Sequence, residues 1–309
     1  VTLLRSPLDI FIGSMLMTNN STLSMTNSSI NMQAAGGDFT ALDFACVTLL
    51  NTPVNINGGS IDFNENTCMH ATDTPIEVYS GSVVFSHNSL LNLTTPLSTL
   101  TVNDGNFELR DTANFLTVPY TQIIINGGNF NVYDGVNLDF NLVDMFVGGN
   151  VGFSQESTLD MVDSNLNIVG GTFRMQNDTS IHVESSNVTV TNGTLSTANN
   201  VNFEILSGSN ILVEGNVIFS GSVLSNHDIT NSNLTIRSGG DLVIQQHAHL
   251  ELDNAFGSIL DGSLEMFENS QLTVFNSIVS LDGDGTLHIH DESAVTVTDD
   301  STLSVNSNG

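Results

Sequence analysis

A glycine-anchored repeat of about 22 residues runs along the chain and constrains its fold more than any other feature. The intervals between these glycines range from 21 to 25 residues. We take the following as coil origins: Gly13, Gly37, Gly59, Gly81, Gly105, Gly128, Gly149, Gly171, Gly193, Gly215, Gly240, Gly262 and Gly285. A solenoid built from such repeats grows without forming separate cores, so chain length alone does not indicate two domains.

Apolar residues recur at fixed offsets from these origins. The second residue after the origin is apolar in all thirteen repeats. Offsets +4 and +10 are apolar in twelve each, with Thr197 and Ser225 as the exceptions, whereas offset +11 is apolar only at Leu116. This alternation with a period of two is typical of strands that bury one face. A third apolar pair near +17 and +19 completes three short strands per repeat.

The pattern predicts an all-β, right-handed parallel β-helix of about 13 coils of 21–25 residues, three strands each, over residues 1–309 as a single solenoid. A left-handed hexapeptide helix would repeat every ~18 residues, and leucine-rich repeats need a motif that is missing here. We expect Phe107, Phe130 and Phe173 to point inward on one face. Prolines at +14 to +16 fit the turn before the third strand, because proline cannot donate to a strand ladder.

Two regions depart from this regularity. Ser225 and His227 occupy usually apolar offsets, so we expect a loop or bulge near residues 222–232. Residues 8–12 and 302–305 look like third strands, and no amphipathic capping helix flanks them. Uncapped coils expose strand edges that associate. We therefore expect a segment of a longer repeat protein or a filament subunit, whose partner is self, either head to tail or as a continuing solenoid.

The charge balance excludes several partners. The chain has four Lys+Arg and 33 Asp+Glu, a net charge of −29. Nucleic acids and anionic membranes bind clustered cationic side chains, so both are excluded. No apolar run reaches the ~18 residues that span a bilayer. Cations, above all Ca²⁺, are the natural small partners of such a surface.

Cys46 and Cys68 both lie at +9 of successive coils. Equivalent Cα atoms on neighbouring parallel strands are about 4.8 Å apart, within the disulfide range. We expect a disulfide and hence an oxidising, extracellular compartment; two free thiols are the alternative.

Asparagine recurs at +7 and predicts a left-handed turn residue or an amide ladder. The positions are Asn20, Asn66, Asn88, Asn200 and Asn269. N-glycosylation sequons also avoid the inward offsets, so each could be reached by a glycosyltransferase. They begin at Asn19, Asn20, Asn27, Asn92, Asn177, Asn187, Asn192 and Asn233.

Candidate metal ligands are few, and no cofactor is required. Asp139, Asp160, His182 and Glu204 share the outward offset +11, where carboxylates about 5 Å apart could bridge Ca²⁺ or form a retaining glycosidase pair. A solvated acidic stripe is the simpler interpretation. Asp282 and Asp284 form one copy of a fragment that resembles a Ca²⁺-binding nonapeptide repeat, which normally needs adjacent copies. The pairs His247/His249 and His288/His290 lie two coils apart and are expected to be exposed.

Two coils carry a more specific motif. Gly58-Gly59-Ser60-Ile61 precedes Phe63-Asn64-Glu65-Asn66, and Gly81-Ser82-Val83-Val84 precedes Phe85-Ser86-His87-Asn88. These resemble the G-G-x-I and F-x-x-N repeats of the chlamydial polymorphic outer membrane proteins. That resemblance implies a β-helical autotransporter passenger on the cell surface with a role in adhesion, and host or cell-surface molecules or glycans as partners.

The sequence favours an extracellular structural or adhesive shaft, stalk or filament subunit. A polysaccharide-active β-helix enzyme, a lyase or glycoside hydrolase, is the alternative. A lyase needs a cationic group to activate the sugar C–H bond, but this chain offers only scattered arginines. It also has no Trp and three Tyr, few aromatic platforms for sugars. No catalytic constellation stands out.

Overall fold

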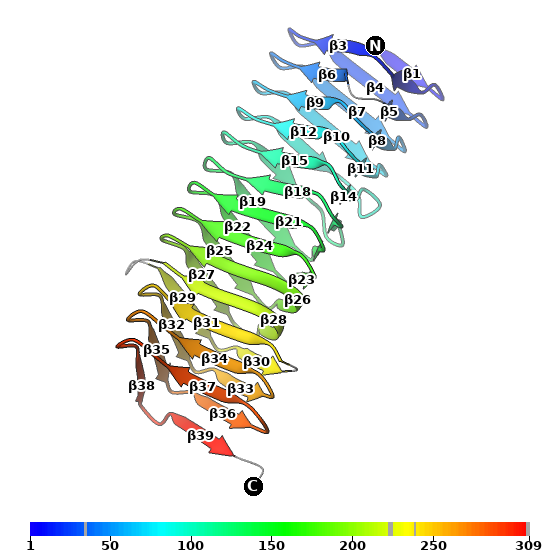
Figure 1. Ribbon diagram of the computed structural model, residues 1–309. Coiled ribbons are helices and arrows are strands. Elements are labelled where there is room, and N and C mark those ends of the chain that lie inside the picture. Colours follow the sequence, from blue (N-terminus) through cyan, green and yellow to red (C-terminus); the bar gives the residue numbers. More distant parts are fainter. Residues whose placement is uncertain (34–35, 222–224, 238, 307–309) are drawn as a thin grey trace. The chain divides into compact units, whose positions relative to one another are not determined.

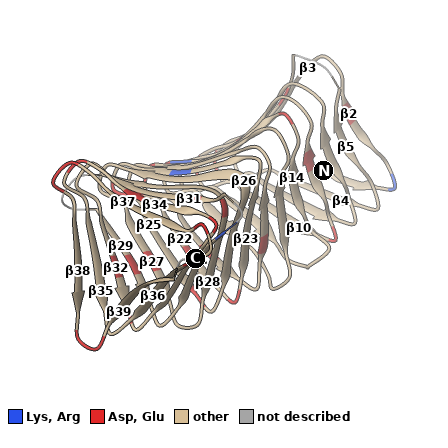
Figure 2. Cartoon of the chain, turned by 60° about the horizontal axis from the view of Figure 1, so that its bottom comes forward, with Lys and Arg blue, Asp and Glu red and all other residues tan. Residues whose placement is uncertain are grey.

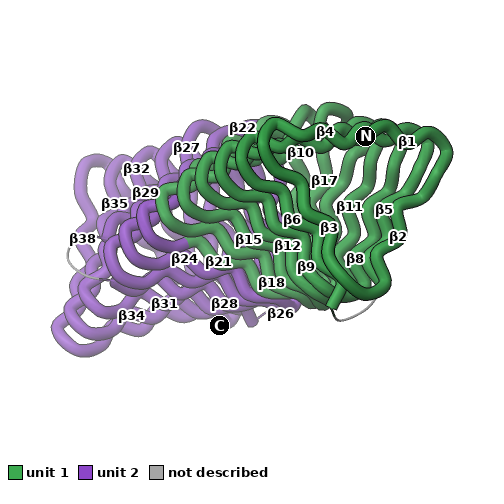
Figure 3. The backbone as a smooth tube through the Cα atoms, turned by 90° about the horizontal axis from the view of Figure 1, so that it is seen from above, with its two compact units in different colours: residues 1–153 green, residues 154–309 purple. Residues whose placement is uncertain are grey.

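The computed structural model describes residues 1–33, 36–221, 225–237 and 239–306, and every regular element in them is a β-strand (Figure 1). The chain divides into two compact units, Val1–Phe153 and Ser154–Gly309 (Figure 3). Each unit is a parallel β-solenoid whose strands form two sheets. The first is here named sheet A, and the two stacks of strands that make up the second are here named sheets B and C. No helix in the described part of the chain is long and apolar enough to cross a membrane.

The first unit stacks each of its strands on the equivalent strand of the next coil. Sheet A contains β1 (Thr2–Leu4), β4 (Thr22–Thr26), β7 (Cys46–Leu50), β10 (Cys68–Thr72), β13 (Leu90–Leu93), β16 (Asn114–Leu116) and β19 (Asn137–Asn141). Sheet B contains β2 (Leu8–Ile10), β5 (Ile30–Met32), β8 (Val54–Ile56), β11 (Ile76–Val78), β14 (Leu100–Val102), β17 (Gln122–Ile125) and β20 (Asp144–Val147). Sheet C contains β3 (Gly13–Met17), β6 (Gly37–Ala41), β9 (Ser60–Phe63), β12 (Ser82–Phe85), β15 (Asn106–Leu109), β18 (Asn129–Val132) and β21 (Asn150–Ser154).

The second unit repeats this arrangement, with two long strands that pass from sheet B into sheet C. Those strands are β26 (Asn187–Ala198) and β28 (Asn210–Ser220). Sheet A contains β22 (Thr158–Val162), β25 (Ser180–Glu184), β27 (Asn202–Leu206), β29 (Asn226–Thr230), β32 (His249–Asp253), β35 (Gln271–Phe275) and β38 (Ala294–Thr298). Sheet B adds β23 (Asn165–Val169), β30 (Asn233–Arg237), β33 (Phe256–Leu260), β36 (Ile278–Asp282) and β39 (Thr302–Asn306). Sheet C adds β24 (Thr172–Gln176), β31 (Asp241–Gln245), β34 (Ser263–Met266) and β37 (Thr286–Ile289).

The predicted fold class, a parallel β-helix with three strands per coil, is confirmed. Seven sheet A strands in each unit make about 14 turns in the described chain, one more than the thirteen glycine origins. The extra turn comes from β1 and β2, which precede the first origin, Gly13. A single solenoid over residues 1–309 remains a prediction.

Inward side chains stack in rows along each unit, as the alternation predicts. Phe107 pairs in register with Phe130, and their rings stack with centroids 5.4 Å apart. Phe173 lies at the equivalent inward position of sheet C in the second unit, and all three rings are buried. Burial of one face of every strand leaves the alternate residues outward, which is why Leu116 at offset +11 is half exposed.

Tight turns between sheets C and A explain the recurrent asparagine at offset +7. In most coils two successive residues have positive φ, as with Glu65 and Asn66 at 60° and 61°, and His87 and Asn88 at 50° and 61°. Asparagine adopts this left-handed conformation at little cost. The structural role predicted for these asparagines is confirmed.

Buried hydroxyl groups line the corner between sheets A and B. Ser186 Oγ donates a hydrogen bond to the Glu184 carbonyl two residues earlier (2.7 Å) and accepts one from the Ser164 backbone N–H of the preceding coil (2.8 Å). Thr52 and Thr74 repeat this arrangement in the first unit. Each hydroxyl thereby satisfies backbone groups that the turn would otherwise leave buried and unpaired.

The irregular coil after Gly215 differs from its prediction. Residues 226–230, expected in a loop or bulge, form the regular strand β29, while residues 222–224 lie outside the described part. The register pairs His227 with Phe203 and with Leu250, which are both inward residues at offset +10. His227, at offset +12 of its own coil, therefore takes the inward position that offset +10 takes in the neighbouring coils. Two additional residues in this coil therefore shift its inward position from Ser225 to His227.

Candidate functional site

An acidic ladder runs along the outward face of sheet A in the second unit. Asp160, His182 and Glu204 are in register on β22, β25 and β27, as predicted. Asp228 and Glu251 continue the row on β29 and β32. We name these five residues the acidic ladder. Figure 2 shows that Asp and Glu residues are spread along the chain, whereas Lys and Arg residues are few.

The ladder residues interact mainly with each other and with their neighbours. His182 Nδ1 lies 3.1 Å from Glu204 Oε2, and Asn202 Nδ2 donates to Glu204 Oε1 at 2.8 Å. Burial raises the pKa of Asp228 above its ordinary value, and the carboxylates of Glu251 and Glu204 raise it further. Glu204 is therefore held by contacts from His182 and Asn202, while the surroundings of Asp228 favour its protonated form more than water does.

The two sequence-derived cation candidates are not equivalent. Asp139 lies on β19 of the first unit, and the ladder carboxylates do not form a group of three ligand atoms within coordination reach among the described residues. Asp282 Oδ1 accepts a hydrogen bond from Asn306 Nδ2 at 2.9 Å, and the Asp284 backbone N–H donates to Asp261 Oδ1 at 3.0 Å. Asp282 and Asp284 thus belong to inter-coil hydrogen bonding, and Ca²⁺ binding at either place remains a prediction.

The two His-x-His pairs do not converge. His249 Nε2 lies 2.9 Å from Thr273 Oγ1, and His247 is exposed in a turn. Both line a shallow polar groove of about 250 Å³ with Asn226, Asn269 and Gln271. His288 lies 3.7 Å from Glu265, and the His290 ring stacks on Phe267 at 4.8 Å. Apart from His249, which is half-buried, these histidines are exposed as expected.

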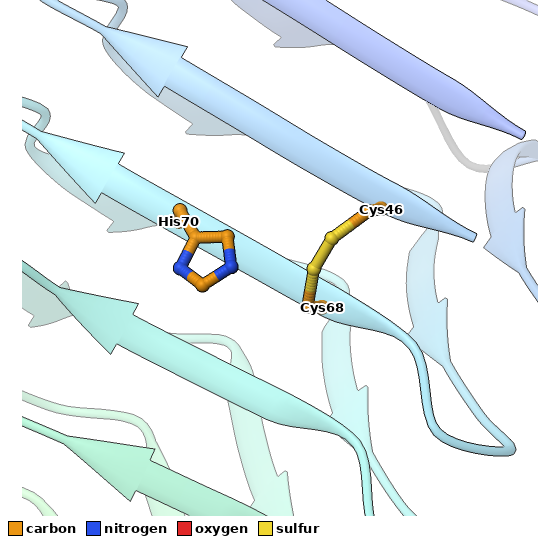
Figure 4. A group of neighbouring side chains, drawn as sticks. All are labelled: Cys46, Cys68 and His70. Carbon is orange, nitrogen blue, oxygen red and sulfur yellow. A yellow bond between two sulfur atoms is a disulfide. The ribbon is translucent and has the colours of Figure 1, made fainter. Parts of the chain in front are cut away.

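Cys46 and Cys68 lie directly opposite each other on β7 and β10 and are joined as a disulfide, with Cα atoms 4.6 Å apart. The predicted pairing is confirmed. His70 follows two residues later on the same outward face of β10 (Figure 4). Its proximity was not recognised from the sequence, although the spacing Cys-x-His on one strand places both side chains on one face.

The sequon asparagines are exposed or half-exposed. Several take part in amide ladders between coils: Asn187 Nδ2 donates to Asn165 Oδ1 at 3.0 Å, and Asn233 Nδ2 donates to Asn210 Oδ1 at 2.9 Å. Asn27 instead accepts from Asn51 through its Oδ1 at 2.7 Å. Their accessibility agrees with the prediction, and their glycosylation remains a prediction.

Comparisons with known proteins add little to this site. No protein-family model and no curated protein matches the chain. One similar solved structure is the crystal structure of the TibC-catalyzed hyper-glycosylated TibA55-350 fragment, with 17% identity over 97% of this chain and 99% of that chain and a TM-score of 0.33. Identity and TM-score this low carry no argument about function.

Proposed function

We propose that this chain is an extracellular structural or adhesive shaft. The observation that carries the proposal is the contrast between the two faces of every strand. Inward rows are apolar and buried in almost every coil, whereas outward polar side chains contact equivalent residues of adjacent coils, as in the Asn106–Asn129–Asn150 ladder with amide contacts of 2.7 and 3.0 Å. Such contacts stiffen the stack of coils, as a shaft requires.

The two motif-bearing coils support a place among β-helical surface adhesins. Ile61 and Phe63 point inward from β9, and Asn66 occupies the left-handed turn position. Gly59 has a φ of 75°, and a Cβ there would meet the Gly37 carbonyl oxygen of the preceding coil. Each specified residue of the motif thus has a role in building a coil.

An oxidising, extracellular compartment fits two observations. The Cys46–Cys68 disulfide bridges two adjacent strands, and such bonds persist outside the reducing cytosol. The sequon asparagines are also accessible on the outward face, as a surface glycoprotein requires. Glycans and cell-surface molecules are accordingly the proposed ligands of an adhesive shaft.

A further β-coil of the same kind is the proposed partner of each end. Ile289, Val297 and Val305 are in register with the buried Met266, Val274 and Leu281 of the preceding coil, yet they are 48%, 40% and 71% exposed. Another parallel coil would bury these side chains and pair the open strand edges.

A glycoside hydrolase is the second candidate, favoured by one observation. Asp228, whose pKa is raised, lies between the carboxylates of Glu204 and Glu251 on adjacent strands. Retaining hydrolases use such an acid and a carboxylate about 5 Å apart. The neighbouring groove lined by His247 and His249 is shallow, and no aromatic residue lines it.

One experiment separates the two candidates. A variant with Asp160→Asn, Glu204→Gln, Asp228→Asn and Glu251→Gln removes the acidity of the ladder and leaves the inward rows intact. The chain and this variant are compared for adhesion of chain-coated beads to cultured cells and for release of reducing ends from a polysaccharide panel. A shaft predicts equal adhesion by both and no sugar release by either; turnover by the natural chain that the variant loses would refute it.

A further inference from the structure

Three metal-ligating side chains share one outward patch in the first unit. Cys46 and Cys68 lie opposite each other on β7 and β10, and His70 is two residues beyond Cys68. Their ligand atoms all lie within 4.8 Å of one another, and all three residues are half-exposed. Among the described residues, this is the one group of three or more His, Cys, Asp or Glu side chains that meets such a limit.

The imidazole is oriented toward the sulfur atoms. His70 Nδ1 contacts Asn92 Nδ2 of β13 at 3.4 Å, which leaves Nε2 on the ring edge that faces the cysteines (Figure 4). The ligands stand on neighbouring strands of one sheet, and regular strands hold side chains more precisely than loops do.

We propose that reduction of the Cys46–Cys68 disulfide converts this patch into a binding site for a thiophilic cation of the zinc class. Two thiolates and one imidazole are the ligand types that Zn²⁺ prefers. Three protein ligands leave the fourth tetrahedral position open toward solvent, since the patch lies on the outward face of sheet A.

The geometry is within reach of coordination. Tetrahedral Zn–S and Zn–N bonds of about 2.3 and 2.0 Å place ligand atoms about 3.5–3.8 Å apart. The three ligand atoms lie within 4.8 Å of each other, and after reduction the two Sγ atoms, bonded at about 2 Å in a disulfide, must move apart by about 1.7 Å through rotation of the cysteine side chains. The net charge of −29 also raises the local concentration of cations.

Asn92 acts as a positioning residue in this arrangement. Metal binding through Nε2 puts the imidazole proton on Nδ1, which must then donate a hydrogen bond. A 180° rotation of the Asn92 amide presents Oδ1 instead of Nδ2 to that proton at the same place. The ring then keeps its orientation in both states.

The conversion balances with a dithiol as reductant. Two electrons and two protons from the dithiol reduce the S–S bond to two thiols, and the dithiol closes into its own disulfide. Cation binding then releases the two thiol protons to solvent. The patch thus alternates between a covalent link joining β7 to β10 and a metal link between the same strands.

The test uses the full chain and Zn²⁺ alone. The disulfide is reduced with a phosphine, the free thiols are counted, and Zn²⁺ is titrated against a chromophoric chelator. We expect one Zn²⁺ per reduced chain and none per oxidised chain at this site. Co²⁺ in place of Zn²⁺ should produce a thiolate-to-cobalt absorption band, which a merely structural role of these residues would not produce.

Matched variants make the outcome decisive. His70→Ala should leave the disulfide intact and weaken Zn²⁺ binding to the reduced chain by more than tenfold, and Asn92→Ala should weaken it by roughly 10-fold. His182→Ala, on the same outward face of sheet A but in the second unit, should change nothing. Equal affinity in the His70→Ala variant, equal binding by oxidised chain, or no binding with both thiols free would each overturn the proposal.

Discussion

His227 shows at the residue scale how a polar side chain is accommodated in an apolar row. Its exposed fraction is 0%, and its ring stacks on Phe219 with centroids 4.3 Å apart. Nδ1 donates to the His249 carbonyl at 3.1 Å, so Nε2 accepts from the Thr197 hydroxyl at 2.9 Å. Thr197 is itself the one polar residue at offset +4. Thr197 and His227, two of the exceptions to the apolar pattern, therefore satisfy each other across coils.

The burial of His227 predicts acid sensitivity. Burial lowers its pKa from 6.5 to about 4, because the charged ring would lose its hydration in the apolar interior. The unfolded chain therefore binds a proton more readily than the folded chain between these values. The contribution of neutral, buried His227 to the free energy of unfolding is fully present above pH 6.5 and is lost as the pH falls toward 4. The total loss from this one group is about 3 kcal/mol.

Urea unfolding of the natural chain at pH 7.0 and 4.5 measures this loss, since most carboxyl groups titrate lower. His227→Leu should show a smaller difference between the two pH values, because leucine does not titrate. His247→Gln, at an exposed histidine, serves as the control and should retain the natural pH dependence. An equal loss of stability between pH 7.0 and 4.5 in the natural chain and in His227→Leu would contradict the role of His227 in acid sensitivity.

At the scale of elements, stacked phenylalanines hold sheet C of the first unit. Phe107 lies between Phe85 and Phe130, with centroid distances of 5.9 and 5.4 Å, and it also meets Phe115 of sheet A. Phe107→Ala should therefore lower the free energy of unfolding by about 3–5 kcal/mol through the cavity it creates. Leu116→Ala, at the 50% exposed outward position of the adjacent strand, should cost under about 0.5 kcal/mol. If denaturant titration gave similar losses in the free energy of unfolding for both variants, the assignment of Phe107 to the buried face and Leu116 to the outward face would be refuted.

The strands were predictable because alternation and period are local properties. The contacts that satisfy buried polar groups were not, because their partners lie one coil away, about 22 residues along the chain. Ser164 and Ser186 look like ordinary turn residues in sequence, although a hydroxyl at about +15 recurs in many coils and could have revealed the ladder. Ser225 and His227 looked like a loop for the same reason: Thr197, which compensates for His227, belongs to the preceding coil.

The candidate site was predicted only in part. Cys46 lies opposite Cys68, as their equal offsets predict. Asp160, His182 and Glu204 are likewise in register on three successive strands. The continuation through Asp228 was missed, since the two-residue insertion in its coil moves it out of the shared offset. Offsets are counted along the chain from the glycine at the start of each coil. An insertion between two strands therefore changes the offset of every later residue in that coil, and residues at the same offset in other coils no longer lie beside them.

The charge of the whole molecule predicts a response to salt. With a net charge of −29, self-repulsion weakens the folded chain at low ionic strength, so NaCl should raise the melting temperature. Asp228→Asn removes one carboxylate that Glu251 and Glu204 repel, and it should raise the melting temperature most at low salt. Glu156→Gln at an exposed turn is the matched control. An extra gain from Ca²⁺ over NaCl at equal ionic strength, lost with EDTA, would indicate a specific cation.

End-to-end association is the most direct test of the shaft. The chain is measured by light scattering over a hundredfold range of concentration, beside a variant with Val297→Asp and Val305→Asp and a control with Val169→Asp at an outward, 54% exposed position. We predict a mass that rises in whole multiples of the chain for the natural protein and the control, and a monomer for the double variant, because charge on the open coil prevents another coil from stacking. A natural chain that stays monomeric throughout, or a double variant that associates equally, would contradict the account.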